Sequence, residues 1–285
     1  MKIIRTDQPI TDKTRATILF RGDILIQTNI SALYPLIDWT QSLLSDALTP
    51  LHPTTAQAQL TPNAFIDITA AAQTAFRTDE HAKALFFKVL IACGVDLNTT
   101  YYDHFPLRVV PYGATHPSAR NAFISPHRDT WGSNIHSQIN WWAPIYALEK
   151  TRTIAIYPKY WSEPIPNDTA DWRFAKHLES RRNTPAGMKA PYPSAPSPLA
   201  AIDESERVDV MLALGDVLSF SSAHLHGSVP NTSNQTRYSV EMRTINQADV
   251  LHNRAAPNVD NQGIEQMYHW FKCITDKPLS QAEIC

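Results

Sequence analysis

The sequence contains only eight glycines in 285 residues, and no two of them lie close together. A loop that wraps phosphate groups needs clustered glycines, because bare backbone must approach the phosphate closely. The Asp-Phe-Gly and Ala-Pro-Glu motifs of protein kinases are also missing, as is a Val-Ala-Ile-Lys strand. These absences exclude a protein kinase and leave no candidate phosphate-binding loop.

Cysteine and net charge are equally scarce. The three cysteines, Cys93, Cys273 and Cys285, are too widely spaced for a disulfide framework or a zinc knuckle. Cys93 falls within an apolar helical pattern, which predicts that it packs in the core. The net charge is −2 and no basic block is present. We therefore expect neither a nucleic acid nor a membrane surface as a partner.

Long apolar runs are absent as well. The longest run, "ALFFKVLIACGV", is too short and too interrupted to span a bilayer. The N-terminal "MKIIRTDQPITDKTR" contains no apolar segment of signal-peptide length. With 43% hydrophobic and 18% charged residues, the composition is typical of a globular protein. The expected location is the cytoplasm.

Hydrophobic spacing predicts helices in the first third of the chain. Residues 31–48 and 78–94 carry apolar side chains at helical spacing. Ser31 is a candidate N-cap of the first helix, Thr78 or Asp79 of the second, and Gly94 a stop signal. After residue 105 the pattern changes to short β-rich runs at 107–112, 137–148, 153–158, 208–214, 216–220 and 237–245.

This order of elements predicts a single domain that is mainly β with flanking helices, as a sandwich or barrel. Residues 1–104 would form a helical flank and 105–250 the β core. Residues 251–285 would form a C-terminal helix, with its helical pattern at 262–274. Residues 159–205, rich in proline, charge and small side chains, are predicted to be an insertion that forms a lid over the functional site.

The stretch "SPHRDTWGSN" (125–134) fits two chemistries. It matches the kinase catalytic-loop pattern H-R-D-x-x-x-x-N, which is a chance match since the other kinase motifs are missing. It also contains His127-x-Asp129, whose side chains would point the same way from an extended strand. An imidazole and a carboxylate on one face can form two of the three protein ligands of a non-heme iron site.

The third ligand and a carboxylate-binding arginine are expected near the end of the β core. "SSAHLHGSVPNTSNQTRYSVEMR" (221–243) offers His224 and His226 as alternative ligands. Arg237 follows His226 by eleven residues and could bind a carboxylate through its two-pronged guanidinium, with Arg243 as the spare candidate. The co-substrate expected from this combination is 2-oxoglutarate.

The motif "HRD … HGSVPNTSNQTRYS" resembles the phytanoyl-CoA dioxygenase-like branch of the Fe(II)/2-oxoglutarate-dependent dioxygenases. The match comprises His127, Asp129, His226-Gly227-Ser228, Asn231 and Arg237, and it covers about residues 105–245. The resemblance implies a double-stranded β-helix, also called a jelly roll or cupin-like fold. It implies His127, Asp129 and His226 as ligands of Fe(II), and Arg237 as the partner of the far carboxylate of 2-oxoglutarate.

Other residues are weaker candidates for the same site. Gln138 and Asn140 alternate on one face of a strand and could hydrogen-bond the keto acid. Alternatively, they are ordinary strand amides whose hydrogen bonds are satisfied within the protein. Trp131, Arg108, Tyr112 and His224 are candidate pocket residues.

The expected reaction is oxidation, most simply hydroxylation, of an unactivated C–H bond of a small molecule with release of succinate and CO2. A jelly-roll metal-binding protein without turnover and a metal-dependent hydrolase are the alternatives, although neither has a use for Arg237. The substrate and the oligomeric state are not predicted.

Overall fold

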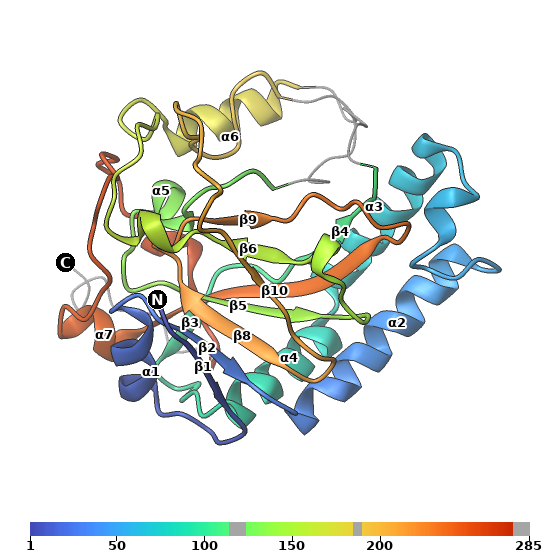
Figure 1. The fold of residues 1–285 in the computed structure, drawn as a ribbon, viewed down its shortest axis with the longest axis horizontal. Coiled ribbons are helices and arrows are strands. Elements are labelled where there is room, and N and C mark those ends of the chain that lie inside the picture. The colour runs from blue at the N-terminus through green and yellow to red at the C-terminus, as the bar shows by residue number, and fades with distance from the viewer. Residues whose placement is uncertain (114–123, 185–189, 276–285) are drawn as a thin grey trace.

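The structure is a computed structural model, and residues 1–113, 124–184 and 190–275 are described. The protein is built in three layers (Figure 1). Helices cover one face of an eight-stranded sheet, and a three-stranded sheet lies on the other side. One apolar core fills the space between helices and large sheet, and a second lies between the sheets. The predicted β core with flanking helices is thus observed as a mixed α/β arrangement with two sheets.

The large sheet contains strands from both ends of the chain. Its hydrogen-bonded order is β1 (Ile3–Thr6), β2 (Ile24–Gln27), β8 (Val217–Ser221), β5 (Ile139–Pro144), β10 (Arg237–Asn246), β3 (Thr100–Tyr102) and β11 (Lys272–Cys273), with β4 (Leu107–Val110) also paired to β10. Only the β1–β2 pair is parallel. The small sheet has the order β7 (Val208–Val210), β6 (Ile154–Ile156) and β9 (His226–Ser228).

Strand β10 determines which side chains face the space between the sheets. Because successive side chains of a strand point to opposite faces, Tyr238 and Val240 pack into the helix-side core, whereas Arg237, Glu241 and Arg243 face the other way. The sheet register places Arg243 opposite Asn140 of β5. Charged side chains from β10 therefore gather on the inner face of the large sheet.

The helices are α1 (Asp12–Leu19), α2 (Tyr34–Leu48), α3 (Pro62–Thr78), α4 (Glu80–Ala92), α5 (Asp129–Ser133), α6 (Phe174–Arg182) and α7 (Gln247–Leu251), with short 3-10 turns at Ser31–Leu33, Ala56–Ala58, Lys150–Arg152, Pro158–Trp161 and Tyr268–Trp270. The helices predicted at 31–48 and 78–94 are confirmed as α2 and α4. Asp79 caps α4 by accepting a hydrogen bond from the Ala82 amide, at 2.7 Å. Ser31, by contrast, begins a 3-10 turn without a side-chain cap.

Gly94 ends the α4 segment for two physical reasons. Its φ of +88° is a left-handed conformation that side chains other than glycine's rarely adopt. A Cβ atom at this position would also lie 2.6 Å from the carbonyl oxygen of Ile10. The predicted stop signal is therefore confirmed. The absence of a side chain at Gly94 also lets the backbone at Ile10 pack closely against it.

The prediction of a helix at the C-terminal end of the chain was wrong. Residues 262–274 do not form a helix, since this segment contains a 3-10 turn and strand β11, whose Lys272 and Cys273 pair with β3. Met267 and Phe271 are buried while Ile264 is 78% exposed, so the apolar residues anchor an extended segment rather than one helical face. The remainder of the predicted C-terminal helix, residues 276–285 with Cys285, lies outside the described residues.

The N-terminal flank contains helices α1 to α4 and also supplies β1, β2 and β3 to the large sheet. Strand β2 is buried along its whole length, and Leu25 and Ile26 pack on opposite faces of the sheet. A four-residue strand buried on both faces gives no alternation in the sequence, so the pattern was not recognised.

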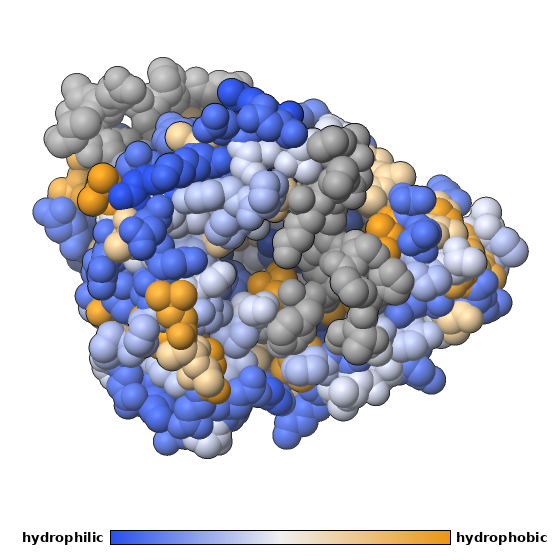
Figure 2. Space-filling model, turned by 90° about the horizontal axis from the view of Figure 1, so that it is seen from above, coloured by the Kyte–Doolittle hydropathy of each residue, from blue (hydrophilic) through white to orange (hydrophobic). Residues whose placement is uncertain are grey.

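Helix lengths and exposed apolar side chains of the described residues can be compared with what a bilayer requires. No helix in the described ranges is both long enough and apolar enough to cross a bilayer. The face seen in Figure 2 is largely hydrophilic, with small separate apolar patches. The larger exposed apolar side chains are dispersed along the chain and include Ile91, Leu199, Leu251 and Ile264.

Candidate active site

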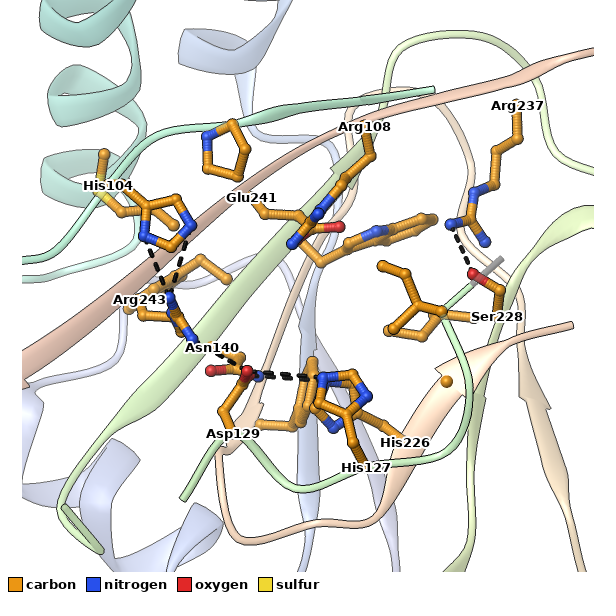
Figure 3. A pocket seen from close by; sticks show the side chains of 18 residues that line it. His104, Arg108, His127, Asp129, Asn140, His226, Ser228, Arg237, Glu241 and Arg243 are labelled. Carbon is orange, nitrogen blue, oxygen red and sulfur yellow. Dashed lines mark hydrogen bonds and ion pairs between the residues drawn. The ribbon is translucent and has the colours of Figure 1, made fainter. Parts of the chain in front are cut away.

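A cavity of about 560 Å³, open to solvent, lies between the two sheets (Figure 3). Its buried end is formed by Arg237, Ser228, Trp142 and Ile154, each 6% exposed or less. Its more open end carries charged side chains that point inward from different strands in Figure 3. The lining residues are His104, Pro106, Arg108, Ile124, His127, Asp129, Asn140, Trp141, Trp142, Ile154, Phe220, His226, Gly227, Ser228, Arg237, Glu241, Met242 and Arg243.

His127, Asp129 and His226 come together at one wall of this cavity. The backbones of His127 and His226 form an isolated antiparallel bridge with N–O distances of 2.9 and 3.0 Å. Arg128 between the first two is extended, with φ −109° and ψ 134°. Side chains on either side of an extended residue share a face, so His127 and Asp129 both point toward His226, although Asp129 begins helix α5.

The two histidines present equivalent ring nitrogens to Asp129. Nδ1 of His127 lies 2.9 Å from the Ser125 carbonyl oxygen, and Nδ1 of His226 lies 3.0 Å from that of His224. A carbonyl can only accept a hydrogen bond, so each Nδ1 carries the proton and each Nε2 offers a lone pair. Both Nε2 atoms lie 3.6 Å from an Asp129 oxygen.

These separations suit three atoms that surround one ion. Ligands that bind a metal at about 2.1 Å and at right angles are roughly 3 Å apart. One ligand atom from each of His127, Asp129 and His226 lies within 4.8 Å of the others, so the three can hold a metal ion. Two imidazole nitrogens and one carboxylate on one side of an ion match the facial arrangement of non-heme Fe(II) sites.

Protonation in the cavity favours metal binding. Burial, reinforced by the neighbouring His127, lowers the pKa of His226 to about 4, so the ring is neutral at ordinary pH. Burial alone would raise the pKa of Asp129, but the charge of Arg243 outweighs burial and holds that pKa well below 3.8. A neutral imidazole and an ionised carboxylate are the forms that bind a metal.

Both oxygens of Asp129 are also held by neighbouring strands. Arg243 donates to Oδ1 at 3.0 Å, and the Asn140 amide donates to Oδ2 at 2.5 Å. Arg243 in turn contacts the buried Asp103 at 2.5 Å and the His104 ring at 3.1 Å. These contacts fix the rotation of the Asp129 carboxylate and therefore its orientation toward the two histidines.

Arg237 occupies the buried end of the cavity without a carboxylate partner. It is 3% exposed and donates from Nη1 to the Thr153 carbonyl oxygen at 2.6 Å and from Nη2 to the Ser228 hydroxyl at 3.2 Å. Its Nε has no hydrogen-bond acceptor, and no ion pair reaches it from the part of the chain that the structure describes. Burial lowers the pKa of Arg237 to about 10, which still leaves it charged near neutral pH.

Arg108 and Glu241 form an ion pair at the more open end. Arg108 Nε lies 2.8 Å from Glu241 Oε2, and the side chains are 24% and 22% exposed. The prediction that Arg108 faces the pocket agrees with this position, and Glu241 was not recognised from the sequence. An Arg-x-Ser-x-Glu-x-Arg alternation in β10 (237–243) was the available signal, since it places three charged side chains on one face.

Gln138 and His224 lie behind the cavity wall. Gln138 donates to the Ser222 hydroxyl at 2.8 Å, and Ser222 donates to Asn140 at 2.5 Å. The two predicted amides thus form a chain that ends at Asp129, and only Asn140 lines the cavity. His224 is fully buried against the Trp161 ring, with centroids 4.4 Å apart, and is not part of the metal-binding group.

The predicted pocket residue Trp131 does not line the cavity. Trp131 is 2% exposed and points away from the cavity, where its Nε1 donates to Asp260 at 2.7 Å. Tyr112 also lies elsewhere, with its backbone amide and carbonyl bonded to Gln57. Trp131 lies in helix α5, and strand β4 ends at Val110, two residues before Tyr112.

The described residues of the predicted lid do not reach the cavity. Residues 159–184 and 190–205 line no part of the cavity. Tyr160 and Ile165 pack instead with Trp131 and Leu225 in a separate apolar cluster, and helix α6 has no buried residue. Residues 185–189 of the predicted lid lie outside the described residues.

No protein-family model and no curated protein matches the sequence. Solved structures do match at low identity. EvdO2 from Micromonospora carbonacea var. aurantiaca, complexed with 2-oxoglutarate, has a TM-score of 0.46 and 12% identity, and the match covers 82% of this chain and 89% of that one. The non-heme monooxygenase ThoJ in its apo form has a TM-score of 0.45 and 12% identity over 82% and 76% of the two chains.

A third similar structure is SnoK, a non-heme alpha ketoglutarate dependent carbocyclase from nogalamycin biosynthesis. Its TM-score is 0.37 and its identity 13%, over 67% of this chain and 70% of that one. In this chain, His127, Asp129 and His226 lie together in one cavity and can hold a metal ion.

Proposed function

We propose that this protein is an Fe(II)- and 2-oxoglutarate-dependent oxygenase that oxidises an unactivated C–H bond of a small molecule and releases succinate and CO2. The observation that carries the proposal is the presence, in one cavity, of a three-ligand metal group and a buried arginine without an acidic partner. An ordinary metal-binding site explains the first feature only. A co-substrate that has a metal-chelating end and a distant carboxylate explains both.

The donor set fits Fe(II). His127 and His226 offer their Nε2 atoms and Asp129 an ionised carboxylate, from one side, which leaves further coordination positions for other ligands. Bound iron would supply the activation of O2. The chain's own residues orient the ligands: Asn140 and Arg243 hold the two oxygens of Asp129, and backbone carbonyls hold the rings of the two histidines.

Arg237 fits the far carboxylate of 2-oxoglutarate. A buried guanidinium that lacks a counter-ion loses hydration energy, and an anionic ligand would restore it through two parallel hydrogen bonds. The unpaired Nε supports a ligand that approaches from the cavity. The Ser228 hydroxyl, which already contacts Nη2, is placed to bind the same carboxylate.

The choice between Arg237 and the spare candidate Arg243 is supported by charge. Arg243 already contacts two carboxylates, Asp103 and Asp129. A third carboxylate would leave an excess of negative charge in a buried region, which is costly. Arg237 is the cationic side chain of the cavity whose charge is not balanced by a direct ion pair within the described ranges.

The fold proposal follows from the same site. We infer that the two sheets form the double-stranded β-helix of this group of enzymes and that the chain belongs with its phytanoyl-CoA dioxygenase-like branch. The supporting features are a cavity between the sheets and candidate metal ligands at its wall.

A metal-dependent hydrolase or a binding protein without turnover would use the ligands but not Arg237.

Turnover of 2-oxoglutarate tests this function. Purified protein with Fe(II), ascorbate and 2-oxoglutarate should form succinate slowly even without a substrate, and a screen of small molecules should find compounds that accelerate it. His127→Ala protein, which keeps Arg237 and the fold, serves as the matched control and should form none. If intact protein forms no more succinate than the His127→Ala protein, under any condition that loads iron, the proposal is wrong.

A further inference from the structure

Arg128, the residue between the two metal-ligand candidates of the His-x-Asp motif, makes several buried polar contacts. Arg128 is 3% exposed and points away from the cavity. Its Nη1 donates to the Ala223 carbonyl oxygen at 2.6 Å, and its Nη2 donates to the Tyr160 carbonyl oxygen at 2.5 Å. Nε and Nη2 both reach Asp260 Oδ2, at 3.1 and 3.0 Å.

Asp260 completes the cluster from the C-terminal segment. Its side chain is 4% exposed. Besides Arg128, it accepts hydrogen bonds from Trp131 Nε1 at 2.7 Å and from the Ile165 amide at 3.1 Å. Both charges are therefore buried, paired and fully hydrogen-bonded, which is the condition under which a buried ion pair is tolerated.

The contacts join four segments that are distant in the sequence. Arg128 and Trp131 belong to the His-x-Asp segment, Tyr160 and Ile165 to the start of the insertion, and Asp260 to the C-terminal segment. The fourth segment leads to the distal histidine, since Ala223 precedes His226 by three residues. The pair thus contacts both stretches of chain that supply metal ligands.

We propose that Arg128 and Asp260 are positioning residues for the metal centre, an inference that rests on the proposed function. Residue 128 is extended, so its side chain and those of His127 and Asp129 lie on opposite sides of the backbone. Rotation of this segment about its own axis would turn both ligands out of the cavity, and the anchored guanidinium prevents that rotation. The bond to Ala223 holds the distal segment at a constant distance.

The alternative is that the pair contributes only to the stability of the fold. Replacement of a buried ion pair by apolar side chains of similar volume is often neutral or stabilising. The double variant Arg128→Met with Asp260→Leu removes every polar contact of the pair and leaves neither charge buried without its partner. Loss of a group that orients metal ligands typically weakens metal binding by about 10- to 100-fold.

The test uses Co(II) as the probe, because its visible absorption spectrum reports both affinity and ligand geometry. Metal-free wild-type protein, the double variant and Asp260→Asn are titrated with Co(II), and their thermal unfolding is recorded without metal. Asp249→Asn is the matched control, because Asp249 is a buried carboxylate paired with Arg254 at 2.7 Å but does not line the cavity.

We expect the double variant to bind Co(II) at least tenfold more weakly than wild type, with an altered spectrum at saturation, while the Asp249→Asn protein keeps the wild-type spectrum and affinity. Wild-type affinity and spectrum in the folded double variant would overturn the inference and leave the proposed function intact. If the double variant does not fold, the pair is structural and the inference is also overturned, unless folded Asp260→Asn protein shows the same weakened binding. Failure of the wild-type protein to bind Co(II) would instead contradict the proposed function.

Discussion

Arg243 donates to Oδ1 of Asp129 at 3.0 Å and contacts the buried Asp103 at 2.5 Å with its other terminal nitrogen. One guanidinium therefore bridges a candidate metal ligand and a carboxylate that is 2% exposed. Burial alone would raise the pKa of Asp103, and the charge of Arg243 overcomes this and holds that pKa below its ordinary value. This bridge makes the orientation of Asp129 dependent on residues 26 positions earlier and 114 positions later in the chain.

Removal of the bridge is expected to destabilise the metal-free protein. Arg243→Gln leaves Asp103 buried with only His104 as a partner, and breaking a buried pair in this way costs on the order of 3 kcal/mol of unfolding free energy. The additional change Asp103→Asn removes the unpaired charge and should restore part of the loss. Urea unfolding measures both effects.

A surface pair provides the control for this experiment. Arg21, which is 54% exposed, pairs with Asp23 at 2.7 Å, so Arg21→Gln should cost less than about 1 kcal/mol. If Arg243→Gln is no more harmful than Arg21→Gln, or if Asp103→Asn does not improve the Arg243→Gln protein, the bridge does not have the described role.

Metal binding should distinguish the two histidines near the distal position. His226→Ala removes a ligand atom and is expected to abolish stoichiometric Fe(II) binding under anaerobic conditions. His224→Phe keeps a buried aromatic ring beside Trp161 and should retain it. Loss of iron in His224→Phe with retention in His226→Ala would show that the distal ligand has been assigned to the wrong residue.

The apparent Michaelis constant for 2-oxoglutarate should depend on Arg237. Removal of one partner of a buried charge pair costs about 2–5 kcal/mol, so Arg237→Ala should raise the constant by roughly thirtyfold or more. Arg237→Lys should recover only part of the loss, because a lysine cannot form two parallel hydrogen bonds. Arg108→Ala, at the open end of the cavity, is the matched control and should change the constant little; an equal effect in both variants would contradict the assignment.

The stability of the metal-free protein should fall in mildly acidic solution. Burial lowers the pKa of His224 to about 3 and that of His226 to about 4, from an ordinary value of 6.5. Between about pH 4 and 6.5, the two histidines bind more protons in the unfolded chain than in the folded one. The free energy of unfolding therefore decreases as the pH falls from about 6.5 toward 4. Each histidine contributes on the order of 3 kcal/mol to this decrease.

His224→Phe separates the contributions, since it removes one titrating ring without removing a proposed metal ligand. Its unfolding free energy should depend less steeply on pH than that of the wild-type protein between pH 4 and 6.5. Identical pH dependences in the two proteins would show that His224 is not held neutral by burial.

The candidate site could be predicted from the sequence only where local spacing determines it. His127 and Asp129 stand on either side of a single extended residue, so their common orientation follows from strand geometry. The approach of His226 depends on an isolated bridge between segments about 100 residues apart, and it was predicted by resemblance to a known family. The charge that holds Asp129 comes from Arg243, whose pairing with Asp103 required the sheet register.

The errors have physical causes of the same kind. Trp131 was predicted as a pocket residue, but helix α5 turns it toward Asp260. The C-terminal segment has apolar residues at spacings compatible with a helix, yet Lys272 and Cys273 satisfy their backbone by pairing with β3. Local propensity was outweighed there by backbone pairing with β3, which would be the edge of the sheet without β11.

The central claim is that this cavity binds Fe(II) and 2-oxoglutarate together, with the metal and Arg237 at the two ends of one co-substrate. The most direct measurement is an anaerobic titration of the metal-free protein with 2-oxoglutarate, with and without one equivalent of Fe(II), followed by visible absorption and calorimetry. The account predicts one 2-oxoglutarate per iron, a new visible absorption band that requires both components, and at least thirtyfold weaker binding in the Arg237→Ala protein. Binding of 2-oxoglutarate that is equally tight without the metal, or no binding at all to the iron-loaded protein, would contradict it.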